Sequence, residues 1–257
     1  MDSALITGAG KRVGKAIALH LGGQGVRIAV HYRNSQDAAE ETAETIRAAG
    51  GNAATVRADL ESEEETAGLI DAAAEALGTA PTILINSASC FEHDDVTSVT
   101  AESWSRHMQV NLRAPLVLSQ CFAANLPDGA PGDNAHGNII NILDQRVWRL
   151  TPEFTSYTVS KSALWTLTRT LAQGLAPRIR VNAVGPGPVL ANRHQSAESF
   201  AREASAVPLQ KGASPEEIAR TISFILEIQS MTGQMIALDG GQHLAWKTPD
   251  FLAGGIE

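Results

Sequence analysis

The N-terminal segment, residues 3–21, constrains the fold more than any other part of the chain. Residues 3–7 are a short apolar run typical of a strand, and residues 16–21 have the apolar spacing of a helix. The stretch between them, residues 8–14, contains glycines that let the backbone turn tightly and approach a ligand. A strand, a glycine turn and a helix N-terminus together bind the pyrophosphate of a dinucleotide. We therefore expect this segment to begin a dinucleotide-binding fold.

Strand-like and helix-like segments alternate along the rest of the chain. We expect strands near 3–7, 26–31, 53–57, 82–86, 137–143, 179–184 and 234–238, and helices near 12–23, 36–49, 61–78, 102–126, 155–175 and 214–228. Continuous apolar runs such as residues 82–85 are typical of parallel strands that are covered on both faces. The predicted fold class is α/β: a single-domain Rossmann-type doubly wound parallel sheet of about seven strands with helices on both faces. Since no repeat or linker indicates a second domain, residues 1–257 are expected to form one domain.

Composition limits the classes of function. The net charge of −8 argues against nucleic acid or an anionic membrane as a partner. There is no apolar run of about 18 residues, and the first strand begins at residue 3, so we expect a cytoplasmic protein without a leader peptide or membrane span. The two cysteines, Cys90 and Cys121, indicate neither a disulfide framework nor a metal cluster, and no metal site is predicted.

A second motif concerns chemistry rather than fold. Tyr157 and Lys161 stand four residues apart in a helical segment, so their side chains lie on one face. A phenol titrates near pH ~10, and an ammonium about 4 Å away can lower that pKa by a few units. The pair therefore predicts a tyrosine that acts as a general acid. The alternative is two unrelated residues on a solvated helix face, but the glycine turn upstream favours the catalytic interpretation.

The end of the second strand bears on the choice of nucleotide. NAD-binding folds place an acid there to accept from the ribose 2′-hydroxyl, whereas this chain has no acid before Asp37. Arg33 can instead hold a 2′-phosphate through its guanidinium. Neighbouring groups that can assist it are Lys11, Arg12, Asn34 and Ser35. NADPH is thus favoured over NADH; the alternative is that these side chains are ordinary solvated charges.

Motifs along essentially the whole chain resemble those of the short-chain dehydrogenases/reductases, which share this fold and catalyse NAD(P)-dependent hydride transfer. The residues that carry the resemblance are Thr7, Gly8, Gly14, Asp59, Leu60, Asn86, Ala88, Asn111, Tyr157, Lys161, Pro186, Gly187 and the segment 238–241. The resemblance implies that Tyr157 is the general acid, that Lys161 lowers its pKa and binds the nicotinamide ribose, and that Asn111 supports a proton-relay water. The cofactor-binding residues expected in all are Gly8, Lys11, Arg12, Val13, Gly14, His31, Arg33, Asn34, Ser35, Asp59, Leu60, Asn86, Ala88, Ser89, Lys161, Pro186 and Gly187.

Two positions depart from the family pattern. Arg12 replaces a glycine, and Asp144 stands where the family has a serine thirteen residues before the tyrosine. One interpretation is decay of the site, because a carboxylate beside a phenol raises the pKa of the phenol. The other is a different substrate, because a carboxyl group can carry protons or pair with the amidine-like edge of a nitrogen heterocycle.

The second interpretation is favoured because the chain resembles one subgroup, the pteridine reductases, that shares both departures. The matching positions are residues 7–14, 31–35, 86–91 and 144, and the ending 239–244 is similar to that of dihydromonapterin reductases. The resemblance implies NADPH-dependent reduction of a pterin C=N bond, with the pterin stacked on Phe91. The proton would come from Tyr157, Asp144 and Lys161, and Arg12 would touch both the pyrophosphate and the pterin edge.

Two other functions stay open: a short-chain reductase of 3-oxoacyl or other carbonyl compounds, and a non-catalytic NADPH-binding regulatory protein. Residues 190–210 are expected to form a lid over the substrate. The tail, residues 243–257, contains Trp246, Pro249 and Phe251, which suggests an arm across a subunit interface; a free C-terminal end is the alternative. The family resemblance points to a homotetramer with helices 102–126 and 155–175 at one dimer face.

Overall fold

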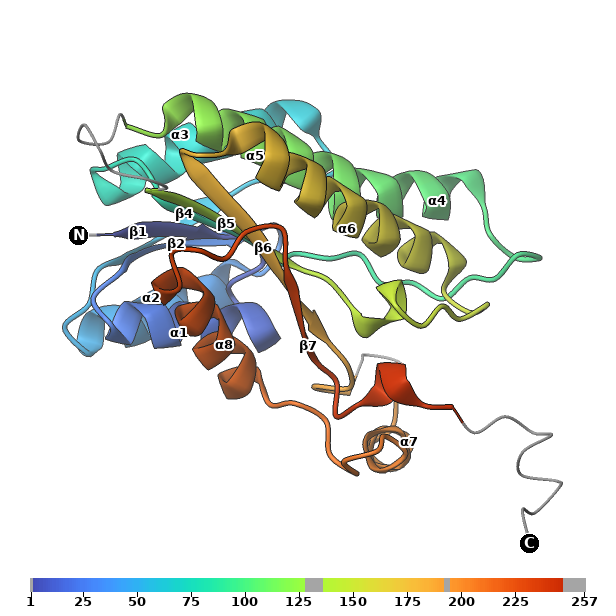
Figure 1. The fold of residues 1–257 in the computed structure, drawn as a ribbon. Helices are drawn as coiled ribbons and strands as arrows, with labels where there is room; N and C mark the ends of the chain where they lie inside the picture. Colours follow the sequence, from blue (N-terminus) through green and yellow to red (C-terminus); the bar gives the residue numbers. More distant parts are fainter. Residues whose placement is uncertain (1, 128–135, 192–194, 247–257) are drawn as a thin grey trace, which may run out of the picture.

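A single parallel sheet organises the chain. The computed structural model describes residues 2–127, 136–191 and 195–246. The strands are β1 Ser3–Ile6, β2 Arg27–Tyr32, β3 Ala53–Arg57, β4 Ile83–Asn86, β5 Gly137–Ile142, β6 Ile179–Pro186 and β7 Met235–Leu238. Every neighbouring pair is parallel, and the order across the sheet is β3-β2-β1-β4-β5-β6-β7 (Figure 1). The predicted seven-stranded, doubly wound Rossmann-type fold is confirmed.

Helices cover both faces of this sheet (Figure 1). On one face lie α1 Arg12–Gly23, α2 Gln36–Ala48 and α8 Pro215–Glu227; on the other lie α3 Glu63–Leu77, α5 Ala114–Asn125 and α6 Thr155–Leu175, with α4 Ala101–Met108 beyond them. The remaining helix among the described residues, α7 Ala197–Ser205, stands near the carboxyl end of β6 and buries none of its residues.

The apolar core has two layers because strand side chains alternate between the faces of the sheet. In β1, Ala4 and Ile6 pack in the layer that contains Ile17 of α1, whereas Leu5 packs in the layer that contains Phe122 of α5. All of these side chains are at most 2 % exposed. Burial on both faces is the reason that the strands have continuous apolar sequences.

The strand order places a switch point at the carboxyl ends of the strands. β1 pairs with β2 on one side and with β4 on the other, so the connections that leave β1 and β4 run in opposite directions. In open α/β sheets, ligands bind outside the carboxyl ends of the strands at this point. The carboxyl ends of β1, β2, β4, β5 and β6 therefore position the candidate site.

The helix expected over residues 102–126 is correct in extent but is not continuous. It consists of α4, a π-helical turn at Gln109–Arg113, and α5. The turn carries Asn111, which is fully buried and whose Nδ2 donates to the carbonyl of Cys90 at 2.9 Å. Single π turns inside α-helices are frequent at functional sites. α7, which falls inside the expected lid, was not predicted.

Parts of two expected elements cannot be compared with the structure. Residues 192–194 of the expected lid and 247–257 of the expected arm lie outside the described residues. Within the described ranges, no helix has both the length and the apolar character required to span a bilayer.

Candidate active site

The glycine turn after β1 has the geometry that the sequence predicts. Gly8 has φ +65°, and a Cβ there would lie 3.0 Å from the Cα of Ala88. A Cβ at Gly14 would lie 2.4 Å from the carbonyl oxygen of Gly8, so α1 can approach the turn only with glycine here. The first turn of α1 contains no acid and receives no side-chain cap. Its N–H groups and positive dipole end therefore suit an anion.

His31 is buried and supports the glycine turn through a hydrogen bond with Gly8. It is 2 % exposed, its Nδ1 accepts from the Gly8 N–H at 3.0 Å, and its Nε2 lies 3.1 Å from the carbonyl of Ala58. These partners require the neutral tautomer with the proton on Nε2. Burial lowers the pKa of His31 to about 4, which keeps the ring neutral. The expected direct contact with the cofactor is replaced by a positioning role, because both ring nitrogens are already engaged.

Arg33, expected to hold a 2′-phosphate, is present at the end of β2 but is already paired. Its guanidinium contacts the carboxylate of Glu61, and Nη1 lies 3.5 Å from Oδ1 of Asp59. The other oxygen of Glu61 lies 3.5 Å from Nε of Arg106 on α4. No acid directly follows β2 in the sequence. In the fold, however, the segment after β3 places Asp59 and Glu61 beside Arg33.

The remaining predicted cofactor residues fall into three groups by exposure. Lys11, Arg12, Asn34 and Ser89 are exposed; Val13, Ser35, Asp59, Ala88 and Gly187 are half-buried; Leu60, Asn86 and Pro186 are buried. Asn86 lies within the sheet, where its Nδ2 donates to Oδ1 of Asn141 at 2.8 Å. The N–H of Ala88 donates to the hydroxyl oxygen of Thr7 at 3.0 Å, and this bond fixes the end of β4 against the end of β1. Asn86 therefore stabilises the sheet, and Ala88 lines its edge.

Arg12 does not point where the resemblance implies. It has φ +54°, a conformation that is uncommon outside glycine. Its Nη1 and Nη2 donate to the carbonyls of Ala191 and Leu190 at 2.8 and 3.1 Å. Arg12 thus joins the glycine turn to the first residues of the segment expected to be a lid. The expected contact of Arg12 with the substrate is not available while these two bonds are made.

Asp144, Tyr157 and Lys161 are brought together at the end of β5, as predicted. The hydroxyl of Tyr157 donates to Oδ2 of Asp144 at 2.9 Å. The ammonium of Lys161 donates to the carbonyl of Ile142 at 2.8 Å and lies 5.7 Å from the centre of the Tyr157 ring. Tyr157 and Lys161 are 6 % and 2 % exposed. The carboxyl, phenol and ammonium therefore form one cluster, in which Tyr157 and Lys161 are buried and Asp144 is half-buried.

The electrostatics of this cluster overturn one expectation. The pKa of Tyr157 is raised well above its ordinary value by burial and by the adjacent carboxylate of Asp144; it is not lowered by Lys161. Burial lowers the pKa of Lys161 to about 8, a shift that Asp144 partly opposes. Burial also raises the pKa of Asp144, while the charges of Arg146 and Lys161 and hydrogen bonds from Arg146 and Tyr157 oppose the shift. The carboxyl group, not the phenol, is the more readily ionised acid of the pair.

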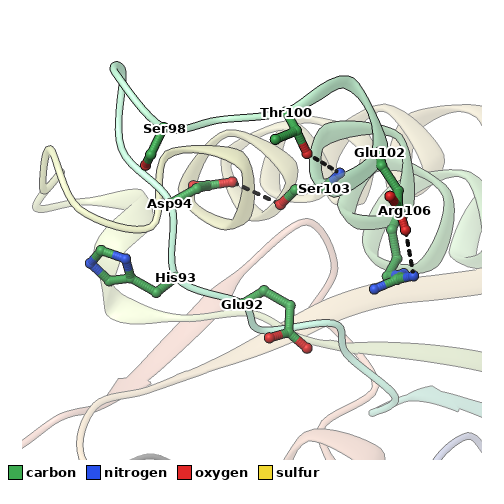
Figure 2. Close-up of a pocket in the computed structure, with 8 residues that line it drawn as sticks. All are labelled: Glu92, His93, Asp94, Ser98, Thr100, Glu102, Ser103 and Arg106. Carbon is green, nitrogen blue, oxygen red and sulfur yellow. Dashed lines mark hydrogen bonds and ion pairs between the residues drawn. The ribbon is translucent and has the colours of Figure 1, made fainter.

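Asp94 is a positioning residue that the sequence did not identify. It is 2 % exposed, and its main-chain oxygen accepts from the Phe154 N–H at 2.6 Å. Its Oδ2 accepts from the Ser103 hydroxyl at 3.0 Å (Figure 2). Its Oδ1 accepts from the Ser156 N–H, also at 3.0 Å. Asp94 thus caps the start of α6 and joins it to α4. Because Tyr157 lies in the first turn of α6, this cap fixes the position of the phenol.

A pocket of about 400 Å³ lies beside Asp94, between α4 and the loop that follows β4 (Figure 2). It is lined by Glu92, His93, Asp94, Ser98, Thr100, Glu102, Ser103 and Arg106. Asp144, Tyr157 and Lys161 do not line it. Inside it, Arg106 pairs with Glu102 at 3.3 Å and Thr100 caps α4 through the N–H of Ser103. The pocket therefore borders Asp94, which positions the start of α6, and not the cluster of Asp144, Tyr157 and Lys161.

Aromatic rings form a wall next to the cluster. The Phe91 and Phe154 rings are stacked with centroids 4.5 Å apart, and Phe91 meets Tyr157 edge-on at 4.7 Å. Phe154 has φ +58°, a strained conformation for a bulky residue, and the Asp94 carbonyl holds it by its N–H. Phe91 therefore lies beside Tyr157 with one ring face covered by Phe154, and its stacking on a substrate stays a prediction.

Asn111 supports the cluster through a neighbour. Its Nδ2 donates to the Ser160 hydroxyl at 3.0 Å, and that hydroxyl donates to the carbonyl of Tyr157 at 2.7 Å. Its Oδ1 accepts from the N–H of Cys90 at 2.8 Å. Asn111 thus ties the loop after β4 to α6, and the proton-relay water remains an expectation.

Comparison with known proteins agrees with this geometry. Residues 8–243 match the model of a family described as enoyl-(acyl carrier protein) reductase. Among solved structures, the FolM alternative dihydrofolate reductase 1 from Brucella suis, in complex with NADP, has a TM-score of 0.92 and 46 % identity over 97 % of this chain and 98 % of that one. The angucycline C-6 ketoreductase LanV with bound NADP has a TM-score of 0.86 and 32 % identity over 95 % and 96 % of the two chains.

A sequence relative points to the same class. An uncharacterized oxidoreductase of Methylorubrum extorquens is 33 % identical over 93 % of this chain and 96 % of its own length. The relatives and neighbours thus share an oxidoreductase class but differ in the substrates that their names state.

Proposed function

We propose that this chain, which belongs to the short-chain dehydrogenase/reductase family, is an NADPH-dependent reductase of pterin C=N bonds. The observation that carries the proposal is the hydrogen bond between Oδ2 of Asp144 and the hydroxyl of Tyr157. A ketone oxygen needs a neutral donor beside the tyrosine, whereas a ring nitrogen that becomes protonated is served by a carboxyl group with a raised pKa. The 46 % identity with a FolM alternative dihydrofolate reductase also supports a substrate of the pterin type.

The cofactor side of the groove fits NADPH. The uncapped start of α1 and the left-handed Gly8 would receive the pyrophosphate. Arg33 would receive the 2′-phosphate after exchanging its contacts with Glu61 and Asp59. Several of the similar structures were solved with NADP or NADPH bound, which supports the same assignment.

The residues of this chain would supply the proton of the reaction. NADPH, when bound, provides a hydride for a ring carbon of the pterin. The neighbouring ring nitrogen takes a proton from Tyr157, whose oxygen takes one in turn from Asp144. In this step Asp144 is protonated, and its carboxyl O–H becomes the donor across the 2.9 Å contact. The carboxylate that remains is stabilised by Arg146 and Lys161, which both lower its pKa, and is reprotonated from water after the step. In this scheme the two side chains titrate as one unit.

A carbonyl reductase is the second candidate, favoured by the retained Tyr157 and Lys161 and by the likeness to LanV. A ketone oxygen would take its proton from Tyr157 directly, and the carboxylate of Asp144 would then oppose the reaction by raising the pKa of that phenol. A serine at position 144 would remove this opposition. The two functions therefore predict opposite effects of the substitution Asp144→Ser.

The test is the rate of NADPH oxidation with dihydrobiopterin, dihydromonapterin and dihydrofolate beside a panel of ketones. We expect turnover on at least one pterin and its loss in Asp144→Ser, while the surface variant Asp71→Ser keeps the wild-type rate. Turnover confined to ketones, and faster in Asp144→Ser, would favour the second candidate instead. Tight binding of NADPH with no turnover on either class would revive the non-catalytic alternative.

The proposal includes assembly into a homotetramer. At the end of the described chain, Leu244 and Trp246 are 64 % and 63 % exposed, and Trp148 nearby is 46 % exposed and packs edge-on to His243. Apolar side chains gathered at one place on a surface favour a protein contact. Light scattering of the eluting protein measures the mass directly, and a monomer at micromolar concentration would contradict this part.

A further inference from the structure

Arg146 lies beside the cluster of Asp144, Tyr157 and Lys161. It follows Asp144 in a short 3₁₀ turn, Gln145–Val147, and its N–H donates to Oδ1 of Asp144 at 2.8 Å. That bond turns the residue back toward α6. Its main chain therefore fixes the same carboxyl group whose other oxygen is bound by Tyr157.

The side chain of Arg146 is held over the aromatic wall. Its guanidinium carbon lies 4.8 Å from the centre of the Phe154 ring, 5.5 Å from that of Phe91 and 6.0 Å from that of Tyr157. A guanidinium over an aromatic face gains stabilisation and loses freedom of rotation. The three rings thus place a fixed cation at the edge of the surface expected to stack a planar substrate.

One terminal nitrogen of the Arg146 guanidinium lacks a hydrogen-bond partner among the described residues. Within the part of the chain that the structure describes, Nη1 of Arg146 is buried and has no hydrogen-bond partner. A buried donor without an acceptor destabilises a protein by about 1–3 kcal/mol, more when it is charged. Arg12, the arginine expected at the substrate, instead has both terminal nitrogens bound to main-chain carbonyls. Of these two arginines, Arg146 is the one whose geometry leaves a donor for a ligand.

We propose that Arg146 is a substrate-binding residue whose Nη1 donates to the ring carbonyl oxygen of a pterin and so selects oxo-pterins. The inference rests on the proposed function and deepens it. A guanidinium has only donors, so it is complementary to a carbonyl oxygen and mismatched to a carbon–hydrogen edge at the same ring position. Seated against Phe91, a ring carbonyl can meet Nη1 while the ring nitrogen faces Tyr157 and Asp144.

The experiment compares two competitive ligands, pterin and 2-aminopteridine, which lacks the ring oxygen. A hydrogen bond to a charged group contributes about 1.5–3 kcal/mol, so wild-type protein with bound NADPH should favour pterin by roughly ten- to a hundredfold. In Arg146→Met the preference should disappear because pterin weakens while 2-aminopteridine does not. Arg146→Lys should retain part of it. Inhibition constants against the preferred dihydropterin give the readout.

Two controls separate this role from packing. Arg149→Met removes the next arginine, whose guanidinium binds the Gln242 carbonyl, and should leave the preference intact. The affinity for NADPH should be unchanged in Arg146→Met, which shows that the groove is still folded. A packing role alone would weaken both ligands equally.

The outcomes also separate this inference from the proposed function. Wild-type protein that turns over pterins, with the oxygen preference retained in Arg146→Met, overturns the inference and leaves the proposed function standing. The same result with the preference lost in Arg12→Met would assign the contact to Arg12 instead. Failure of the wild-type protein to bind either ligand overturns both.

Discussion

The two sides of the candidate groove are held by different kinds of interaction. On the nucleotide side, the glycine turn is fixed by backbone geometry at Gly8 and by the neutral ring of His31. On the substrate side, Asp144, Lys161 and Arg146 place three ionisable groups around one phenol. The nucleotide side thus depends on shape, and the substrate side depends on the balance of buried charges.

This difference explains why the two sides tolerate change differently. A turn built from backbone conformation fails only when a side chain cannot fit, as at Gly14. A cluster of buried charges changes its protonation state whenever one member is removed, because each shifts the pKa of the others. Substitutions on the substrate side should therefore change rates, and those on the nucleotide side should change binding or stability.

The largest effect is expected for Tyr157→Phe, which removes the hydroxyl bound to Asp144. Loss of a positioned acid lowers turnover by about a hundredfold to ten-thousandfold. The dissociation constant of NADPH should stay within about threefold of wild type, since the ring remains and this side acts on rate. Steady-state rates and a fluorescence titration of NADPH measure the two quantities. A variant with near-normal turnover would contradict the assignment.

The nucleotide side should instead respond to pH through its stability. Burial lowers the pKa of His31 from 6.5 in the unfolded chain to about 4 in the folded protein. Between these values the unfolded chain binds more protons, so stability is full above pH ~6.5 and falls by about 3 kcal/mol as pH decreases to 4. Urea unfolding of wild type and His31→Gln across this window checks it: the two curves should converge at low pH. Parallel curves would show that the pKa of His31 is not lowered in the folded state.

Cofactor choice should depend on Arg33. In Arg33→Ala, loss of a bond to the 2′-phosphate should weaken NADPH by roughly ten- to a hundredfold, or about 1.5–3 kcal/mol. NADH has no such phosphate and should bind as before. Arg57→Ala, which removes an exposed arginine of β3 that pairs with Glu65 of α3, serves as the matched control. Equal weakening of both nucleotides would show that Arg33 supports the fold rather than the phosphate.

The smallest effect is expected at Glu61, the acid that competes for Arg33. An exposed ion pair is worth about 0.2–1 kcal/mol, so Glu61→Gln should tighten NADPH by no more than about fivefold. NADH should change little. Glu63→Gln, in which the lost partner is the distant Arg113, controls for the change in net charge. Weaker binding of NADPH in Glu61→Gln would mean that this carboxylate helps to orient Arg33 instead of competing with it.

Much of the fold could be predicted because it depends on local apolar pattern. Each strand was located within about two residues, since a strand covered on both faces must be continuously apolar. The π turn at Asn111 could not be predicted, because it is held by the distant partners Cys90 and Ser160. α7 has no buried residue and so left no core-facing pattern to find.

Residues of the site could be predicted only where the spacing within a motif determines their position. The glycine turn and the proximity of Asp144 to Tyr157 follow from spacing on neighbouring elements. The direction of the Tyr157 pKa shift does not, because it depends on burial and on which charge lies nearer. Asp94 could not be identified from the sequence, since its role depends on contacts with α4 and α6.

The central claim is that Asp144 supplies the proton that Tyr157 delivers, and the pH dependence of kcat with a dihydropterin tests it most directly. The account predicts that kcat falls as pH rises through the raised pKa of Asp144, with a further break at the Lys161 value of about 8. In Asp144→Asn the break that belongs to the carboxyl group should vanish from whatever activity remains. A wild-type profile that shows only the break of Lys161, or a variant that keeps both breaks, would contradict the account.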